Sequence, residues 1–339
     1  MEPNLIVSAS PHFHAPESTR SLMGNVILAL MPTVIASAIL FGWQTLLVTA
    51  VSVGACVFFE WGFCKLLKRP SPIGDLSAVV TGIILAMNLP SPDMSDLSTL
   101  GMSIFMVIVG ALVAIVIVKQ LFGGIGMNFA NPALVGRIVL FVSFATAMNH
   151  WVYPNAAVDQ LASATPLQVA NPASLSVFDL LMGTHGGCMG EVCILAILMG
   201  FAFLVFTKTI SPAIPLTYIG TMFVCYLLSG AGLRGSLIGI LSGGLFFGAV
   251  FMATDYVTSP FTLKGKLIYG LCLGIITFAI RHFGSLTEGV SFSILFMNLW
   301  VQFINDHTRQ TAYGYVKPAK VQKAPAAAAE KPAKGGADK

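Results

Sequence analysis

Charged residues are scarce in this chain of 339 residues. Asp, Glu, Lys and Arg make up 9% of it and hydrophobic residues 56%, whereas an average soluble domain is about 25% charged. That composition excludes a soluble globular protein, and the mean hydropathy of +0.83 is typical of an integral membrane protein. Apolar runs of about 18 or more residues predict helices rather than a barrel, whose strands would alternate in polarity.

Several motifs that mark self-contained enzymes are also missing. The six cysteines include no CxxC pair, and the chain has neither a GxGxxG nor a Walker lysine motif. We therefore expect no metal site and no catalytic residues of its own. Cys188 and Cys193 are close enough in sequence for a disulfide, but free thiols are the favoured interpretation. The net charge of +4 comes mostly from a Lys-rich tail, so it indicates no nucleic-acid partner.

Ten apolar segments predict an all-α integral membrane protein with about ten transmembrane helices. They lie near residues 22–42, 45–64, 73–90, 100–119, 132–148, 191–208, 212–230, 235–254, 266–283 and 289–305. The predicted organisation is an N-terminal cytoplasmic segment, a first five-helix half, an outer-face loop, a second five-helix half and a disordered cytoplasmic tail. Their boundaries are 1–20, 21–148, 149–190, 191–306 and 307–339.

The distribution of Lys and Arg predicts the orientation. With the N-terminus inside, only Arg234 and Arg281 of the 18 basic residues fall outside. Apart from the tail, the inside residues are Arg20, Lys65, Lys68, Arg69, Lys119, Arg137, Lys208, Lys264 and Lys266. Both termini are therefore predicted to be cytoplasmic, and the central loop is predicted to lie on the outer face.

A weak internal repeat accompanies this arrangement. Leu85–Pro92 resembles Met252–Pro260, which aligns Asn88 with Asp255. Two halves of five helices must be inserted in opposite senses, so the pattern predicts an inverted repeat of the kind found in transporters. Chance similarity between apolar segments is the competing explanation.

Thr165 stands in a polar gap without Lys or Arg between His150 and Glu191. Ser163 and Ala164 precede it and Pro166 follows, a composition that by itself favours an ordinary turn. The functional alternative is a hydroxyl on an accessible small-residue loop, to which an enzyme attaches a group. Asp159 would then orient a metal-bound donor.

A glycine-rich stretch, Gly123–Gly126, leads into Asn128, Asn131 and Pro132. One interpretation is helix capping, with Asn at the cap and Pro in the first turn. Four further polar residues, Glu60, Asp75, Asn88 and Asp255, lie nearest the spans. Intramembrane charges are functional by default, but proximity to predicted inner ends favours solvated caps or subunit contacts over an ion pathway.

Five stretches, in order, resemble the family that contains the RnfD component of the Rnf electron-transport complex and, more distantly, the NqrB component of the sodium-translocating NADH:quinone oxidoreductase. The stretches are Ser8–His12, Gly123–Ala133, Ser163–Leu167, Met252–Asp255 with Thr258–Pro260, and Glu288–Phe292. Together they cover the order of the chain over nearly residues 5–310. Only the tail lies outside the resemblance.

The resemblance implies two flavins. In that family a threonine in a pattern similar to Asp-x-x-Ser-Gly-Ala-Thr carries FMN through a phosphoester, installed by a flavin transferase on the outer side. Asp159 and Thr165 match this pattern, whereas Ala162 and Ser163 replace its Ser and Gly. The resemblance also implies a non-covalent riboflavin bordered by the Asn128 and Asn131 stretch.

The function that the resemblance implies is electron transfer between ferredoxin and NAD, coupled to Na+ or H+ translocation across the bacterial cytoplasmic membrane. The implied partners are an outer-face flavin subunit, two small membrane subunits, and cytoplasmic iron–sulfur and NADH-binding subunits. Two alternatives stay open at this point. They are a solute channel or transporter built on a similar inverted repeat, and a structural anchor that has lost its flavin.

Overall fold

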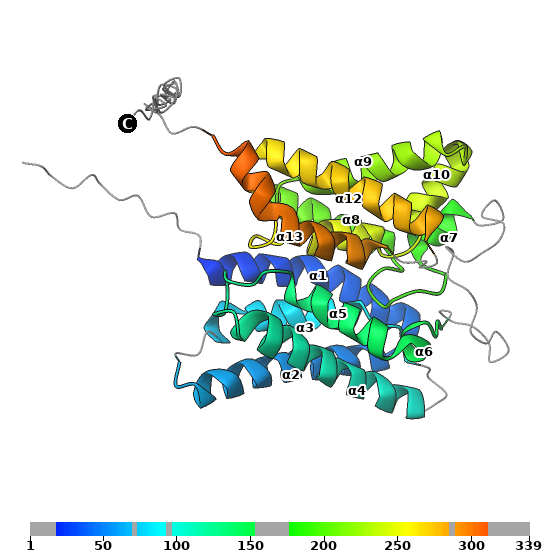
Figure 1. The fold of residues 1–339 in the computed structure, drawn as a ribbon. Helices are drawn as coiled ribbons and strands as arrows, with labels where there is room; N and C mark the ends of the chain where they lie inside the picture. The colour runs from blue at the N-terminus through cyan, green and yellow to red at the C-terminus, as the bar shows by residue number, and fades with distance from the viewer. Residues whose placement is uncertain (1–17, 70–72, 93–96, 153–175, 285–288, 311–339) are drawn as a thin grey trace, which may run out of the picture. The chain divides into compact units, whose positions relative to one another are not determined.

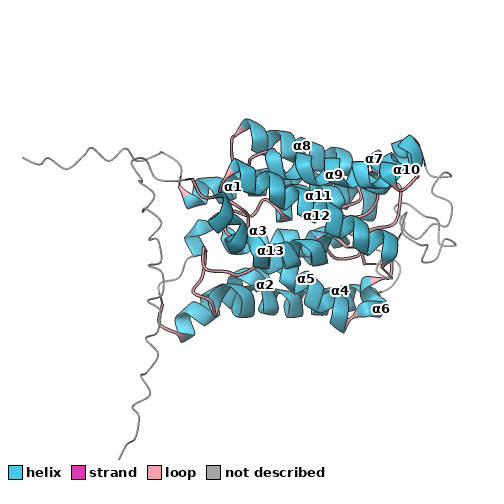
Figure 2. Cartoon of the chain, turned by 45° about the horizontal axis from the view of Figure 1, so that its top comes forward, coloured by secondary structure: helices cyan, strands magenta, loops and turns pink. Residues whose placement is uncertain are grey.

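The computed structural model describes residues 18–69, 73–92, 97–152, 176–284 and 289–310. Within these ranges all regular structure is helical, apart from an isolated bridge between Pro90 and Cys188. Figure 2 shows the helices running alongside one another with most loops near their ends. The chain divides into a helical unit, Met1–Thr308, and a C-terminal unit, Arg309–Lys339. The all-α prediction is confirmed for the described residues.

Each apolar segment of the sequence contains a helix. In the first half these are α1 (Thr19–Phe41), α2 (Gln44–Leu66), α3 (Ser77–Met87), α4 (Leu97–Leu112), which continues as the π-helix η2 (Val113–Gln120), and α5 (Pro132–Ser143). In the second half they are α8 (Ile194–Phe206), α9 (Ala213–Leu228), α10 (Gly232–Leu241), α11 (Leu245–Phe247) with the π-helix η4 (Gly248–Met252), α12 (Leu263–Phe283) and α13 (Val290–Thr308). The short elements η1 (Ile73–Asp75), α6 (Ala145–Met148) and α7 (Val177–Met182) lie between them.

The helices differ in their capacity to cross a bilayer. Four are long and apolar enough by themselves: Thr19–Phe41, Gln44–Leu66, Ser98–Gln120 and Leu263–Phe283. A fifth span results if α10 and α11–η4, which meet at a 62° bend, count as one. Four other apolar helices, α3, α5, α8 and α9, are shorter than 18 residues. The chain is thus a multi-pass membrane protein whose described residues include both full-length apolar helices and shorter or bent ones.

Two helices, α2 and α9, each pack against two later helices. In the first half α2 packs against α3 and α4, and in the second half α9 packs against α10 and α12. Between the halves, α1 packs against α8 and α5 against α13 (Figure 1).

Close backbone approach joins the halves at α1 and α8. A Cβ added to Gly200 would lie 2.3 Å from the carbonyl oxygen of Ala29 and 3.0 Å from the Phe251 ring. Small residues allow this approach, which gives membrane helices much of their packing energy. Gly200 is therefore required for the α1–α8 contact.

We expect Gly200→Ala to destabilise the folded protein by about 1–3 kcal/mol, because the added methyl group overlaps backbone atoms that cannot rotate away. Gly220→Ala on α9 is the matched control, since a Cβ there meets nothing within 4 Å. Thermal unfolding in detergent measures both variants. Equal melting temperatures for the two variants would show that the close contact between α1 and α8 does not contribute to the stability of the fold.

Candidate functional site

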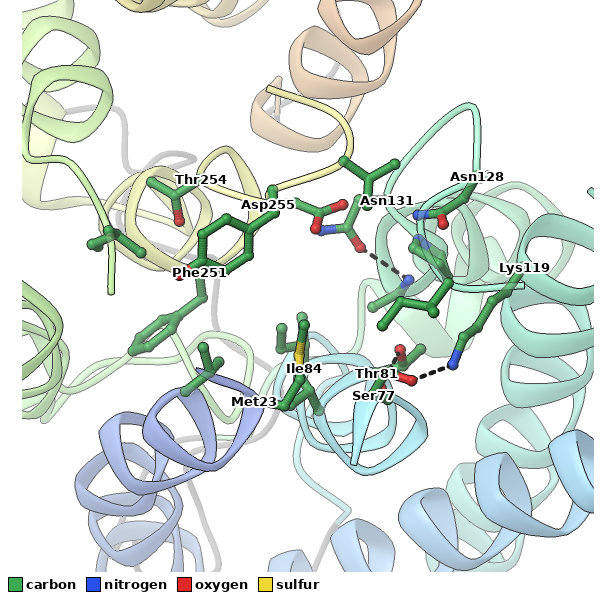
Figure 3. A pocket seen from close by; sticks show the side chains of 18 of the residues that line it. Met23, Ser77, Thr81, Ile84, Lys119, Asn128, Asn131, Phe251, Thr254 and Asp255 are labelled. Atoms are coloured by element: carbon green, nitrogen blue, oxygen red, sulfur yellow. Dashed lines mark hydrogen bonds between the residues drawn. The ribbon is translucent and has the colours of Figure 1, made fainter. Parts of the chain in front are cut away.

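A pocket lies at the starts of α3 and α5 and at the ends of η2 and η4. Its cavity has a volume of about 100 Å³. Asn128 and Asn131, two of the residues singled out by the sequence, both line it. Figure 3 shows Asn131 beside Asp255, and Lys119 directed toward Ser77. The structure thus brings the two asparagines together with an acid, a lysine and hydroxyl groups.

Asn131 holds its position because it caps α5. Its Oδ1 accepts hydrogen bonds from the backbone N–H groups of Ala133 (3.1 Å) and Leu134 (3.4 Å), and Pro132 occupies the first helical position. The capping interpretation of the sequence is therefore confirmed. The amide Nδ2 donates to the carbonyl of Met252, 3.3 Å away, which ties α5 to the end of η4.

The remaining polar groups provide both donors and acceptors. Asn128 is half-buried, and its Nδ2 donates to the Ala130 carbonyl at 3.5 Å. Thr258 donates to the carboxylate of Asp255 at 3.0 Å, which fixes this acceptor at the pocket wall. Asn128 and the second N–H of the Asn131 amide, with the Asp255 carboxylate, can therefore offer both donors and acceptors to a bound ligand.

Behind the pocket wall, Lys119 forms a buried ion pair with Glu60. The Lys119 Nζ lies 2.5 Å from Glu60 Oε1 and 2.5 Å from Ser77 Oγ, and Gln120 Nε2 donates to the same carboxylate oxygen at 2.9 Å. Glu60 is 0% exposed. The expectation that water reaches Glu60 at an inner helix end is wrong, because α2 is covered there by η2 and α3.

Arg137 is the second buried cation. Its Nη1 donates to Asn88 Oδ1 and to Ser291 Oγ, both at 3.0 Å, and its Nη2 lies 3.5 Å from Cys188 Sγ. The side chain is 3% exposed. The sequence counted Lys119 and Arg137 among the loop cations of the inner side; they are not loop residues, because both are buried within helices, η2 and α5. Without these two, the basic residues outside the tail still lie mostly on the predicted inner side.

The partners of Arg137 meet because α3 ends inside the bundle. After Met87 the chain turns at Asn88 and Leu89, and the loop before α8 reaches this turn. Met189 N–H donates to the Leu89 carbonyl at 2.9 Å, and Gly190 N–H donates to the Met87 carbonyl at 2.7 Å. This loop supplies hydrogen bonds that a longer α3 would have made itself. All six cysteines, Cys188 and Cys193 included, are free thiols.

The sequence-predicted attachment residues are not among those that the structure describes. Thr165, Asp159 and Ser163 all lie in the segment 153–175, outside the described residues. The contacts of the predicted FMN site therefore stay a prediction. The nearest described helices before and after this segment are α6 and α7.

Comparison with known proteins decides the family. The NQR2, RnfD, RnfE family matches residues 6–314. The chain belongs to this family. The resemblance first visible in five short stretches is therefore confirmed over most of the chain.

Curated relatives match almost end to end. The D-type subunit of the Na(+)-translocating ferredoxin:NAD(+) oxidoreductase complex of Acetobacterium woodii is 41% identical over 330 residues, 95% of this chain and 99% of that protein. Its counterpart in the proton-translocating ferredoxin:NAD(+) oxidoreductase complex of Clostridium ljungdahlii is 35% identical, with coverage of 91% and 96%. The counterpart in the ion-translocating oxidoreductase complex of Salmonella arizonae is 30% identical, with coverage of 92% and 99%. All three carry the name of an electron-transfer complex, which favours that class of function over a solute channel.

Proposed function

We propose that this chain is the D-type membrane subunit of an Rnf-type complex, which passes electrons between ferredoxin and NAD and couples them to Na+ or H+ translocation. The observation that carries the proposal is 41% identity over 95% of the chain to the D-type subunit of such a complex. Its partners would be an outer-face flavin subunit, two small membrane subunits, and cytoplasmic iron–sulfur and NADH-binding subunits. A flavin transferase would modify it.

The proposed arrangement has ten spans in two inverted five-helix halves in the bacterial cytoplasmic membrane. Two findings support it: every apolar segment contains a helix, and the neighbours of α2 and α9 correspond. Both termini are then cytoplasmic, and the loop that carries Thr165 lies on the outer face. The bias of loop Lys and Arg supports this orientation.

On the outer side, Thr165 is the proposed attachment point for FMN, and Asp159 and Ser163 are the proposed neighbours in the recognition sequence. The support is the match of Asp159, Ala164 and Thr165 to the family pattern. A flavin in such a complex accepts and donates electrons. This chain's part is to hold it at one face of the membrane.

The pocket around Asn128 and Asn131 is the proposed site for a non-covalent riboflavin. Its amides, with Asp255, suit the edge of an isoalloxazine ring. Its present volume of about 100 Å³ is below the roughly 300–1,000 Å³ typical of ligand sites. Binding therefore requires the pocket to widen, and we propose that the adjoining turn, in which Gly123, Gly124 and Gly126 have positive φ, is the part that moves.

We expect Asn131→Ser to lower the content of non-covalent flavin about three- to tenfold, because serine preserves the helix cap but removes the amide. Asn149→Ser is the control, since Asn149 is exposed and does not line the pocket. The measurement is chromatography of flavin released by acid from the purified complex. Equal riboflavin in the two variants would exclude Asn131 as a contact.

A further inference from the structure

A second pocket lies at the end of α8 and the start of α9, and it carries positive charge. Its cavity volume is about 410 Å³. Lys208 and Lys266 line it together with the hydroxyl-bearing residues Thr209, Ser211 and Ser259. Neither Asp nor Glu is among its lining residues. The pocket is therefore a cationic, hydrogen-bonding cavity of a size that ligands occupy.

The placement of the two lysines adds to the positive potential. Lys208 follows α8 in the left-handed conformation, with φ 55°, and is exposed. Lys266 stands in the first turn of α12, where the helix dipole disfavours a cation, and no acidic residue in that turn compensates. The N-terminal end of α9 begins at the same pocket, directly after Ser211 and Pro212. The Ala213 N–H there donates to Ser211 Oγ at 3.4 Å and Pro215 has no N–H, so this end contributes mainly its helix dipole, which favours an anion.

Hydrogen bonds hold the wall of the pocket in place. Asn25 Nδ2 donates to Thr209 Oγ1 at 3.2 Å, and the hydroxyls of Thr207 and Thr209 lie 2.8 Å apart. The Tyr256 hydroxyl donates to the Thr209 carbonyl. Residues from α1, the α8–α9 connection and the segment after η4 thus form one preassembled surface. It adjoins the pocket around Asn128 and Asn131, with which it shares Ile210, Thr254 and Tyr256, but Lys208 and Lys266 line only the cationic pocket.

We propose that this pocket binds the phosphate headgroup of an anionic phospholipid. The pocket lies at helix ends, where headgroups meet a membrane protein, and basic pockets between membrane helices bind such headgroups. Each lysine donates up to three hydrogen bonds to phosphate oxygens. Exposed apolar side chains flank the site on the same elements, Phe206 at 88% and Leu216 at 60% exposure, and they contact the acyl chains.

Native mass spectrometry of the full chain in detergent, titrated with phosphatidylglycerol, tests the proposal. We expect Lys208→Gln/Lys266→Gln to bind this lipid about 30-fold more weakly than the unmodified chain. The matched control is Lys68→Gln/Lys264→Gln. Lys68 also follows a helix with positive φ, and Lys264 stands in the same turn of α12, yet neither lines the pocket.

Binding of a second lipid and competition by small phosphate compounds identify the source of the phosphate. Phosphatidylcholine should bind more weakly than phosphatidylglycerol, and inorganic phosphate or FMN at equal concentration should not displace the lipid. Equal phosphatidylglycerol binding by the two double variants overturns the proposal. Displacement by inorganic phosphate or FMN also overturns it, because the site would then serve a small phosphate compound. Unchanged riboflavin in Lys208→Gln/Lys266→Gln separates this site from the flavin pocket.

Discussion

Thr165→Ala is expected to remove all covalently bound flavin from this chain. A phosphoester requires a side-chain oxygen, and alanine has none. The measurement is in-gel fluorescence of the denatured protein after co-expression with a flavin transferase, since denaturation releases any non-covalent flavin. The unmodified chain should give a fluorescent band at its own mass of 35.9 kDa, and the variant should give none.

Two controls make this result specific. Ser163→Ala removes the neighbouring hydroxyl and should leave the band intact. Restoring the usual family pattern with Ala162→Ser/Ser163→Gly should retain the band or strengthen it, because these are the two positions at which this chain departs from the pattern. A band that survives in Thr165→Ala and disappears in Ser163→Ala would move the attachment to Ser163. A band that survives both changes would place the flavin elsewhere.

Lys119→Met is expected to destabilise the folded protein by about 3–5 kcal/mol. The substitution leaves the Glu60 carboxylate buried at 0% exposure without its cation. Removal of one partner is costly because the remaining charge stays out of water, whereas the pair as a whole contributes little net stability. Thermal unfolding of the purified protein in detergent, at constant lipid content, measures the effect.

A double variant separates the ion pair from simple loss of packing. Lys119→Met/Glu60→Leu removes both charges and should recover most of the lost stability. Lys65→Met provides a surface control on α2, where the side chain is exposed and its Nζ lies 4.6 Å from the centre of the Trp61 ring. Its effect should stay within about 1 kcal/mol. If the double variant is as unstable as Lys119→Met, the cost arises from packing and not from an unpaired charge.

Helix positions were predictable from the sequence, because apolar runs of the right length determine them in a membrane protein. The Asn131 cap was predictable as well, since asparagine before proline at a helix start is a local signal. The burial of individual charged residues was not predictable from the sequence. Lys119 and Arg137 adjoin predicted helix ends, and a rule that counts loop cations treats them as exposed.

Their burial depends on long-range structure that local patterns do not encode. The π-helical end of α4 places Lys119 toward Glu60, and a π-helix has no simple sequence signature. Arg137 is buried because α3 stops after 11 residues and a loop from the other half occupies the space beyond it. The apolar sequence around Lys119 and Arg137 was a signal that both could be buried, because charged residues within membrane segments usually have a structural or functional role.

The burial of Arg137 has a consequence for biosynthesis. Of the side-chain partners of Arg137 named above, only Asn88 has been made when α5 leaves the ribosome, because Cys188 and Ser291 follow 51 and 154 residues later. An arginine at the centre of an isolated helix opposes insertion by about 2.5–3.5 kcal/mol. Arg137 therefore lacks its contacts with Cys188 and Ser291 while the first five helices are being made. The contact with Ser291 forms only after α13 has been made, so we expect a chain that ends before α13 to lack one of the hydrogen bonds that hold Arg137 in the folded protein.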